Sequence, residues 1–280
     1  MSAEQSIGVI FATAIAAGLM GSLTGLGGGV LVIPLLTVGF GLDIRVAIGA
    51  SIVSIIATSS GAAATYVRDH LTNIRIGMLL ELATTTGGLT GAYVTGYLPS
   101  GALFVLFGLV LLVSVVPTAR RLGEELPKGV ASDRAARALR LASSYPDRAS
   151  GQEIPYEVKG VPAGLSMMYI AGVFSGLLGI GAGALKVLAM DTAMRLPMKV
   201  STATSNFMIG VTAAASAGVY FWRGDVVPIV AAPVALGVLA GSSVGARLLL
   251  RFPNVTVRLI FIPVLAGVAI EMLLRGFGVA

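Results

Sequence analysis

The 280-residue chain has no cysteine, a single histidine and few charged side chains, which make up 11% of its residues. The lack of cysteine excludes disulfides, thiolate metal sites and thiol or persulfide chemistry. The scarcity of charge excludes an ordinary soluble protein and a disordered chain. What the chain does have is apolar residues, which amount to 56% and give a mean hydropathy of +0.92. These values predict a protein that resides in a lipid bilayer.

Enzyme signatures are also missing from the sequence. It contains no Walker A pattern, no HExxH, no Cys/His cluster and no dinucleotide fingerprint. We therefore predict no enzyme activity, no cofactor and no metal site. The net charge of +6 is accounted for by basic loops at an inner leaflet, so no nucleic-acid partner is expected. Glu4 and the absence of a basic residue before the first apolar run argue against a cleaved signal peptide.

Ten apolar segments fill the chain on either side of one long polar segment, and a bilayer-spanning helix needs about 20 mostly apolar residues. The segments before the polar stretch are 7–23, 29–40, 46–67, 76–97 and 102–117. The segments after it are 161–178, 183–194, 200–222, 226–250 and 255–274. We predict an all-α polytopic membrane protein with a first transmembrane repeat (1–117), a linker (118–160) and a second transmembrane repeat (161–280).

An internal repeat relates the two halves. Shifting the sequence by 154 positions aligns residues 17–92 with 171–246 without a gap. The aligned identities include Gly18/Gly172, Gly25/Gly179, Gly27/Gly181, Gly29/Gly183, Ser51/Ser205, Thr58/Thr212, Tyr66/Tyr220, Gly87/Gly241 and Gly91/Gly245. The positions of the shared glycines indicate an ancient duplication.

The basic residues favour halves of opposite orientation. Segments 29–40 and 183–194 are too short to cross comfortably, so each forms a short or re-entrant element that returns the chain, or else half of one broken span. The first arrangement inverts the halves and places 15 Lys and Arg residues inside and 3 outside, whereas the second makes the halves parallel and gives 12 and 6. Because cytoplasmic loops are enriched in Lys and Arg, we predict inverted repeats with a cytoplasmic linker and both termini outside.

The linker has too few apolar residues for a core of its own. Ser132 is placed to cap a helix on which Ala135, Leu139 and Ala142 share one face. Such a helix suits the surface of the anionic inner leaflet. A plain solvated linker is the alternative.

The glycine-rich stretches at 25–29 and 179–183 are the strongest local signal. In one interpretation they let a helix unwind at membrane depth, which exposes backbone amides to an anion, as in transporters with broken helices. In the other they only permit close helix packing. Their occurrence at equivalent places in two halves favours broken helices. Gly25, Gly27, Gly28, Gly29, Gly179, Gly181 and Gly183 are therefore candidate substrate-binding residues.

Hydroxyl and amide side chains follow each stretch. Ser51, Ser54 and Thr58 share a helical face, as do Ser205 and Thr212. Such neutral donors can replace the hydration shell of an oxyanion, although Ser and Thr also bond back to their own helix. Ser51, Thr58, Ser205, Asn206 and Thr212 complete the candidate substrate site.

Ionisable residues within apolar spans are costly and therefore of functional interest. Lys186 can supply positive charge to an anion site or can extend to the membrane interface. Glu81 is a candidate for proton coupling, or lies near water. Arg45 and Lys199 occupy equivalent repeat positions, where they attract anions to opposite mouths or only determine topology.

With these residues in view, the chain resembles the TauE/SafE sulfite exporter family, also called TSUP. The resemblance rests on the glycine-rich stretch 21–29 followed by Leu-Val-Ile-Pro-Leu-Leu, on its second copy at 179–183, and on the Gly-Ala pairs at 91–92 and 245–246. The second copy departs from the first because it lacks the proline. The resemblance implies an inner-membrane transporter of sulfite, sulfoacetate or related organosulfonates, generally in the export direction.

The residues and the resemblance together predict a secondary transporter that exports a small sulfur-containing anion across the inner membrane. An uncoupled anion channel or uniporter of broader selectivity is the alternative, although inverted halves suit alternating access. A membrane enzyme or an assembly partner for a sulfur pathway is a third hypothesis, which the missing acid/base and metal residues disfavour. The identity of the anion, its coupling and the oligomeric state are not predicted.

Overall fold

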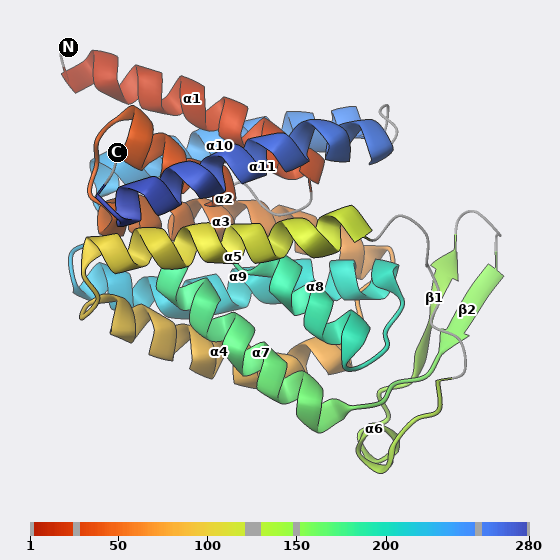
Figure 1. The fold of residues 1–280 in the computed structure, drawn as a ribbon. Helices are drawn as coiled ribbons and strands as arrows, with labels where there is room; N and C mark the ends of the chain where they lie inside the picture. The colour runs from red at the N-terminus through yellow and green to blue at the C-terminus, as the bar shows by residue number, and fades with distance from the viewer. Residues whose placement is uncertain (1–2, 25–28, 121–129, 148–151, 250–253, 279–280) are drawn as a thin grey trace.

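The computed structural model describes residues 3–24, 29–120, 130–147, 152–249 and 254–278 (Figure 1). The first half forms α1 (Ala3–Thr24), α2 (Gly29–Pro34) with a π-helical turn η1 (Leu35–Gly39), α3 (Ile44–Arg68), α4 (Ile74–Thr95) and α5 (Ser100–Arg120). The second half forms α7 (Val161–Leu178), α8 (Gly183–Thr192), α9 (Met198–Trp222), α10 (Pro228–Leu249) and α11 (Asn254–Gly276). The predicted helical architecture is confirmed, and each predicted segment corresponds to an observed helix within a few residues.

Helices at equivalent repeat positions make equivalent contacts. The packing of α1 on α10 corresponds to the packing of α7 on α4, and the contact of α3 with α10 corresponds to that of α9 with α4. The pairs α3–α9 and α5–α11 each join a helix to its own repeat equivalent. From α2 onward, each pair of equivalent helices begins 154 residues apart. The repeat seen in the sequence is therefore also a repeat of elements and contacts.

Many of the repeated glycines lie where two helices touch. A Cβ atom on Gly91 of α4 would lie 2.0 Å from the carbonyl oxygen of Val173 on α7, and one on Gly241 of α10 would lie 2.0 Å from that of Ile15 on α1. Gly18 and Gly172 face backbone atoms of the same partner helices in the same way. At these positions only glycine allows the two backbones to approach so closely.

The outer surface of the bundle is apolar. Leu82 of α4 and Leu236 of α10 are repeat equivalents, and they are 70% and 61% exposed. By length and composition, one described helix, α7, is long and apolar enough on its own to cross a bilayer, and half of that span is buried. Trp222, at the end of α9, is 83% exposed, as expected of an aromatic residue at a membrane interface. Exposed apolar faces of this kind suit contact with lipid.

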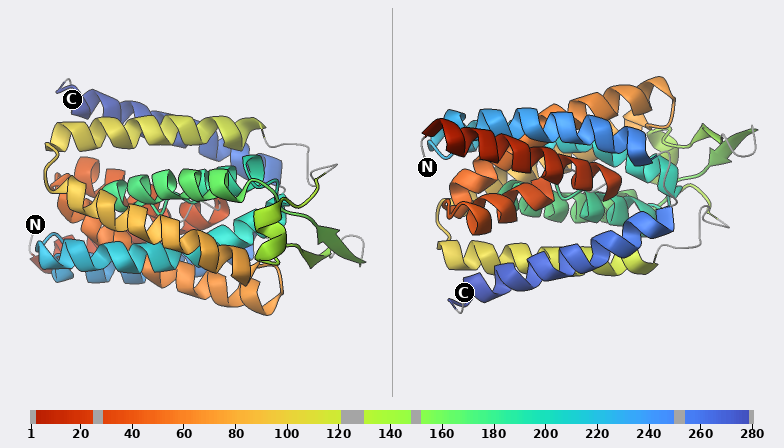
Figure 2. Two further views of the ribbon diagram at one scale, coloured as in Figure 1. Left: turned by 90° about the horizontal axis from the view of Figure 1, so that it is seen from below. Right: turned by 90° about the horizontal axis from the view of Figure 1, so that it is seen from above.

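The two ends of the bundle differ. Both termini lie at one end, which we call the terminal end, and the linker elements lie at the other, the linker end (Figures 1 and 2). Helix α1 begins at the terminal end, whereas its repeat equivalent α7 begins at the linker end, directly after the linker (Figure 1).

The linker forms a short helix, α6 (Arg134–Ala138), and a hairpin of β1 (Ser143–Asp147) and β2 (Gln152–Tyr156), in which Ser143 pairs with Tyr156. Two strands were not predicted. The helix is capped by Asp133 rather than by the predicted Ser132, because the Asp133 carboxylate accepts from the Ala136 N–H at 2.7 Å, while Ser132 bonds Glu157. Leu139 is exposed and Ala136 is buried, so the apolar face differs from the predicted one.

The linker packs against the helices. The Asn73 side-chain amide, just before α4, donates to the Tyr156 hydroxyl at 2.8 Å and to the Leu141 carbonyl at 3.1 Å. Tyr145, Tyr156 and Val158 are buried in one apolar cluster with residues of α4, α7, α8 and α9. The linker is thus held against the helix ends rather than extending freely from them.

Candidate functional site

A helix is interrupted at the second glycine-rich stretch. Helix α7 ends at Leu178 and α8 begins at Gly183 because Gly179, Gly181 and Ala182 have left-handed φ values of +61°, +71° and +46°. Glycine adopts this conformation freely, whereas alanine does so at a cost. All the residues of this interruption, which we call the second break (179–182), are buried. The predicted broken helix is therefore present in the second half.

The corresponding stretch in the first half lies between the end of α1 at Thr24 and the start of α2 at Gly29. Gly25, Gly27 and Gly28 lie outside the described residues. Gly29 is buried, and a Cβ atom added there would lie 2.6 Å from the Ser51 hydroxyl oxygen and 2.4 Å from Ile55. A larger residue at the start of α2 would therefore require the Ser51 and Ile55 side chains to shift.

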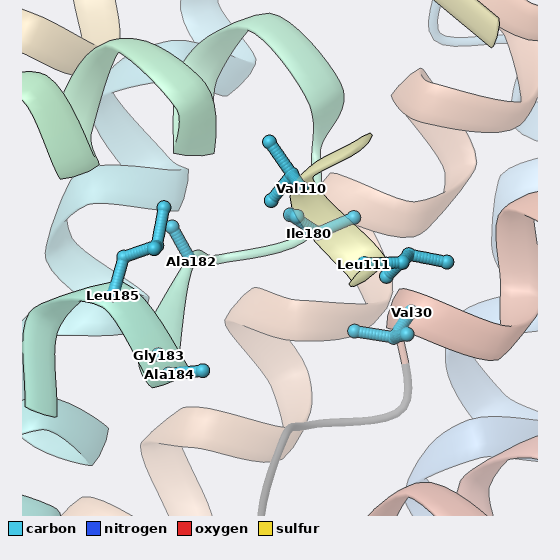
Figure 3. A pocket seen from close by; sticks show the side chains of 8 residues that line it. All are labelled: Val30, Val110, Leu111, Ile180, Ala182, Gly183, Ala184 and Leu185. Carbon is cyan, nitrogen blue, oxygen red and sulfur yellow. The ribbon is translucent and has the colours of Figure 1, made fainter. Parts of the chain in front are cut away.

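A small apolar pocket lies at the start of α8 (Figure 3). The first residues of α8 form one side of it, and Val30 of α2 with Val110 and Leu111 of α5 form the other (Figure 3). Ala182, the N-cap residue of α8, makes no side-chain hydrogen bond to the helix. The N–H groups of its first turn have no acceptor within the helix, and the positive end of the helix dipole lies there. The α5 residues were not predicted, because apolar side chains carry no chemical signal.

Two serines at equivalent repeat positions bond glycine carbonyl groups of the two glycine-rich stretches. The Ser51 hydroxyl of α3 lies 2.7 Å from the Gly179 carbonyl oxygen and 3.2 Å from that of Gly29. The Ser205 hydroxyl of α9 lies 3.3 Å from the Gly183 carbonyl oxygen. Both serines are buried. Their hydroxyl groups therefore hold the broken segments in place, and the predicted role as donors to the substrate competes with these bonds.

Lys186, Thr212 and Glu81 form a buried chain, which we call the charged cluster. The Lys186 ammonium on α8 donates to the Thr212 hydroxyl on α9 at 2.7 Å. That hydroxyl lies 2.7 Å from Oε1 of Glu81 on α4. Lys186 is completely buried and Glu81 is 7% exposed. An ammonium buried in this way is paired through a hydroxyl with a carboxylate, which offsets part of its desolvation cost.

The Glu81 carboxylate is only half satisfied. Oε1 also accepts from the Thr85 hydroxyl at 2.8 Å, so it has two donors. Oε2 is buried and has no hydrogen-bond partner in the described part of the chain. Thr85 was not among the predicted site residues, although its spacing of four from Glu81 on one helix is a usable signal.

The remaining predicted residues lie elsewhere. Thr58 bonds back to the Ser54 carbonyl at 3.0 Å, and the Asn206 amide bonds back to Thr202 at 3.0 Å. The Arg45 guanidinium donates to the Leu98 carbonyl at 2.6 Å, near the terminal end. Lys199 lies in the first turn of α9, close to the linker end. The hydrogen bonds described for Thr58, Asn206 and Arg45 do not reach the second break or the charged cluster.

Apolar helices with exposed apolar faces, interrupted inside the bundle beside a buried charge, are the architecture of helical membrane transport proteins. In the described residues, no group of three or more His, Cys, Asp or Glu side chains is arranged to hold a metal ion.

The chain belongs to the sulfite exporter TauE/SafE family, whose model matches residues 10–272. It is therefore a membrane protein of a transporter family rather than of an enzyme family.

Three curated relatives support this assignment. The probable membrane transporter protein YunE of Bacillus subtilis (strain 168) is 26% identical, over 97% of this chain and 99% of its own length. The probable membrane transporter protein YdhB of the same organism is 25% identical, over 89% and 94%. The probable membrane transporter protein MamO of Paramagnetospirillum magneticum (strain ATCC 700264 / AMB-1) is 24% identical, over 97% of this chain and 45% of its own length. No solved structure matches the chain.

Proposed function

We propose that the protein is a secondary transporter that exports a small sulfur-containing anion, such as sulfite, sulfoacetate or a related organosulfonate, across the cell inner membrane. The family description supports a sulfur oxyanion, whereas the relatives are named only as probable membrane transporters. The observation that carries the proposal is the completely buried Lys186, one turn into the uncapped helix α8. A buried ammonium beside free helix amides is a site for an anion.

The substrate anion would bind at the start of α8. The N–H groups of Gly183, Ala184 and Leu185 would donate to its oxygens, as helix N-termini do for other oxyanions. Lys186 would supply a full positive charge from the same turn. In this proposal Ser51 and Ser205 position the broken segments, and the glycines allow the backbone to approach the anion.

The two halves would be inverted repeats with several membrane crossings, a cytoplasmic linker and both termini outside. The opposite courses of α1 and α7 support this arrangement (Figure 1). The distribution of Lys and Arg supports it independently. Alternating access would then consist of a rocking of one half against the other around the breaks.

Counterflow in proteoliposomes tests the proposal. Proteoliposomes preloaded with unlabelled sulfite accumulate labelled sulfite transiently if they contain a transporter, whereas proteoliposomes that contain a channel do not. The variant to compare carries Lys186→Met with Glu81→Gln, because removing both charges avoids leaving one of them buried and unpaired. The matched control carries Glu271→Gln with Arg275→Met, which removes a half-exposed ion pair with an N–O distance of 3.1 Å on α11.

We expect counterflow by the wild type and by the control, and its loss in the variant that carries Lys186→Met with Glu81→Gln. Sulfite flux without counterflow would instead indicate an uncoupled channel. Unchanged counterflow in the folded double variant would show that Lys186 is not part of the site.

A further inference from the structure

We propose that Glu81 binds a proton when the substrate anion binds at Lys186, so that the anion and the proton cross the membrane together. This inference rests on the proposed function and adds its coupling. It assigns a role to the carboxylate oxygen that the described residues leave without a partner.

Charge balance inside the bundle favours binding of a proton together with the anion. Without substrate, the Lys186 ammonium and the Glu81 carboxylate balance each other through the Thr212 hydroxyl, at 2.7 Å on each side. An anion arriving at Lys186 adds a negative charge to this buried region. The surplus is costly in a medium of low polarity, since Lys186 and Glu81 are the charged side chains that are buried among the described residues. One proton on Glu81 restores the balance.

The geometry of the Glu81 carboxylate also favours binding of a proton. Oε1 already accepts from Thr85 and Thr212, so it is held in place by two hydroxyl groups. Oε2 is buried and has no partner among the described residues. A proton from water that binds at Oε2 turns this oxygen into a donor, and no other bond has to break. The new donor can then bond an oxygen of the anion.

Among the described residues, Lys186 is the buried charged side chain linked to Glu81, through the Thr212 hydroxyl. Tyr169 of α7 bonds Thr90 at the surface, and Tyr220 of α9 bonds Thr95 and Gly176 near the terminal end. Four further groups lie toward the linker end of the bundle. They are Asp191 of α8, Lys199 of α9, Arg75 of α4 and the Arg140 backbone, to which Arg75 donates.

Coupling of this kind has a consequence for the driving force. A singly charged anion that travels with one proton moves no net charge across the membrane. Its export is then independent of the membrane potential, and is driven by the substrate gradient and opposed by any inward proton gradient. An anion that travels alone would instead be driven outward by a negative interior.

Calorimetric titration of the purified full-length protein with sulfite and with methanesulfonate tests the inference. Each titration is run in two buffers with different ionisation enthalpies, which yields the number of protons bound with each anion. Methanesulfonate itself stays ionised near neutral pH. Any proton that is taken up when it binds must therefore be bound by the protein. Glu81→Gln mimics the protonated carboxyl, and Glu271→Gln on α11 is the matched control.

We expect the wild type and Glu271→Gln to bind about one proton more per anion than Glu81→Gln does. Because each anion would bring one proton, wild-type affinity for methanesulfonate should fall by up to about tenfold per unit rise in pH, and that of Glu81→Gln should stay constant. Anion binding without proton binding in the wild type would overturn the coupling alone. If Glu81→Gln does not fold, the number of protons bound by the wild type with methanesulfonate tests the coupling. If only sulfite binds, the difference in bound protons between the wild type and Glu81→Gln tests it. No binding of either anion would overturn the proposed function itself.

Discussion

The Ser51 hydroxyl on α3 donates to the carbonyl oxygen of Gly179, which lies 128 residues later in the chain, at 2.7 Å. This bond joins a helix of the first half to the broken helix of the second half. Gly179 has a left-handed φ of +61°, and Ile48 and Ile52 of α3 pack around it. The position of the second break therefore depends on both halves of the molecule.

Replacing Ser51 by alanine should destabilise the protein. The substitution leaves the buried Gly179 carbonyl without this donor, which costs about 1–3 kcal/mol. The thermal unfolding midpoint in detergent measures the effect. Ser60→Ala is the control, because Ser60 is an exposed residue of the same helix that bonds only its own turn, at Ile56. Equal midpoints for the two variants would show that the inter-half bond contributes nothing.

Replacing Gly91 by alanine should prevent α4 and α7 from packing. The new Cβ atom would lie 2.0 Å from the Val173 carbonyl oxygen, and the overpacking costs about 3 kcal/mol. Gly218→Ala on α9 is the matched control, because no atom lies within 4 Å of a Cβ there. We expect the yield of monodisperse protein to fall for Gly91→Ala and to be kept for Gly218→Ala. A normal yield of Gly91→Ala would contradict the observed close approach.

Acid should loosen the linker through Asp133. The Ala136 N–H is the main cause that lowers the pKa of the Asp133 carboxyl, and the Gly160 N–H also bonds it, at 2.7 Å. Because the folded-state pKa is lowered, the stabilisation is present above the unfolded value of about 3.9 and is lost as the pH falls through the folded value. Hydrogen exchange of the Ala136 and Gly160 amides, corrected for intrinsic rates, measures it.

In the wild type, protection of these amides should fall below about pH 4. In Asp133→Asn it should already be reduced at pH 7, with no further step in that acid range. A wild-type step that survives unchanged in Asp133→Asn would assign the acid sensitivity to another group.

The orientation of the protein can be measured by thiol labelling, since the natural chain has no cysteine. Tyr97→Cys places a thiol at the terminal end and Leu139→Cys places one at the linker end; the natural residues are 72% and 47% exposed. In intact cells, a membrane-impermeant maleimide should label position 97 and leave position 139 unlabelled. The opposite pattern would reverse the proposed topology.

The helices could be predicted from the sequence because their signals are local. The segment 161–178 matches α7 at both ends, where Pro162 suits the first turn and Gly179 takes the left-handed φ that ends the helix. The constant offset of 154 also anticipated which helices are equivalent.

The linker was predicted less well because its signals compete. Ser132 and Asp133 are both good N-caps, and bonds to distant residues distinguish them, because the Gly160 N–H bonds Asp133 whereas Ser132 bonds Glu157. Strands β1 and β2 each contain a proline, Pro146 and Pro155, and few β-branched residues, so nothing local indicated a hairpin.

The charged cluster could not be predicted as a unit. Glu81 and Thr212 are 131 residues apart and come from different halves. The repeat offers no guide either, because the position equivalent to Lys186 is Val32 and the position equivalent to Glu81 is Ala235. Tertiary packing alone brings these residues together.

Thermal unfolding of the purified protein with a panel of anions is the most direct test of whether it binds a sulfur-containing anion selectively. The panel contains sulfite, sulfate, sulfoacetate and taurine, with acetate as the carboxylate control. A ligand present at 100 times its dissociation constant stabilises the folded protein by about 2.7 kcal/mol. We expect a higher thermal unfolding midpoint with sulfite or with one organosulfonate, and no change with acetate. Equal midpoints with every anion, or no shift with any, would contradict it.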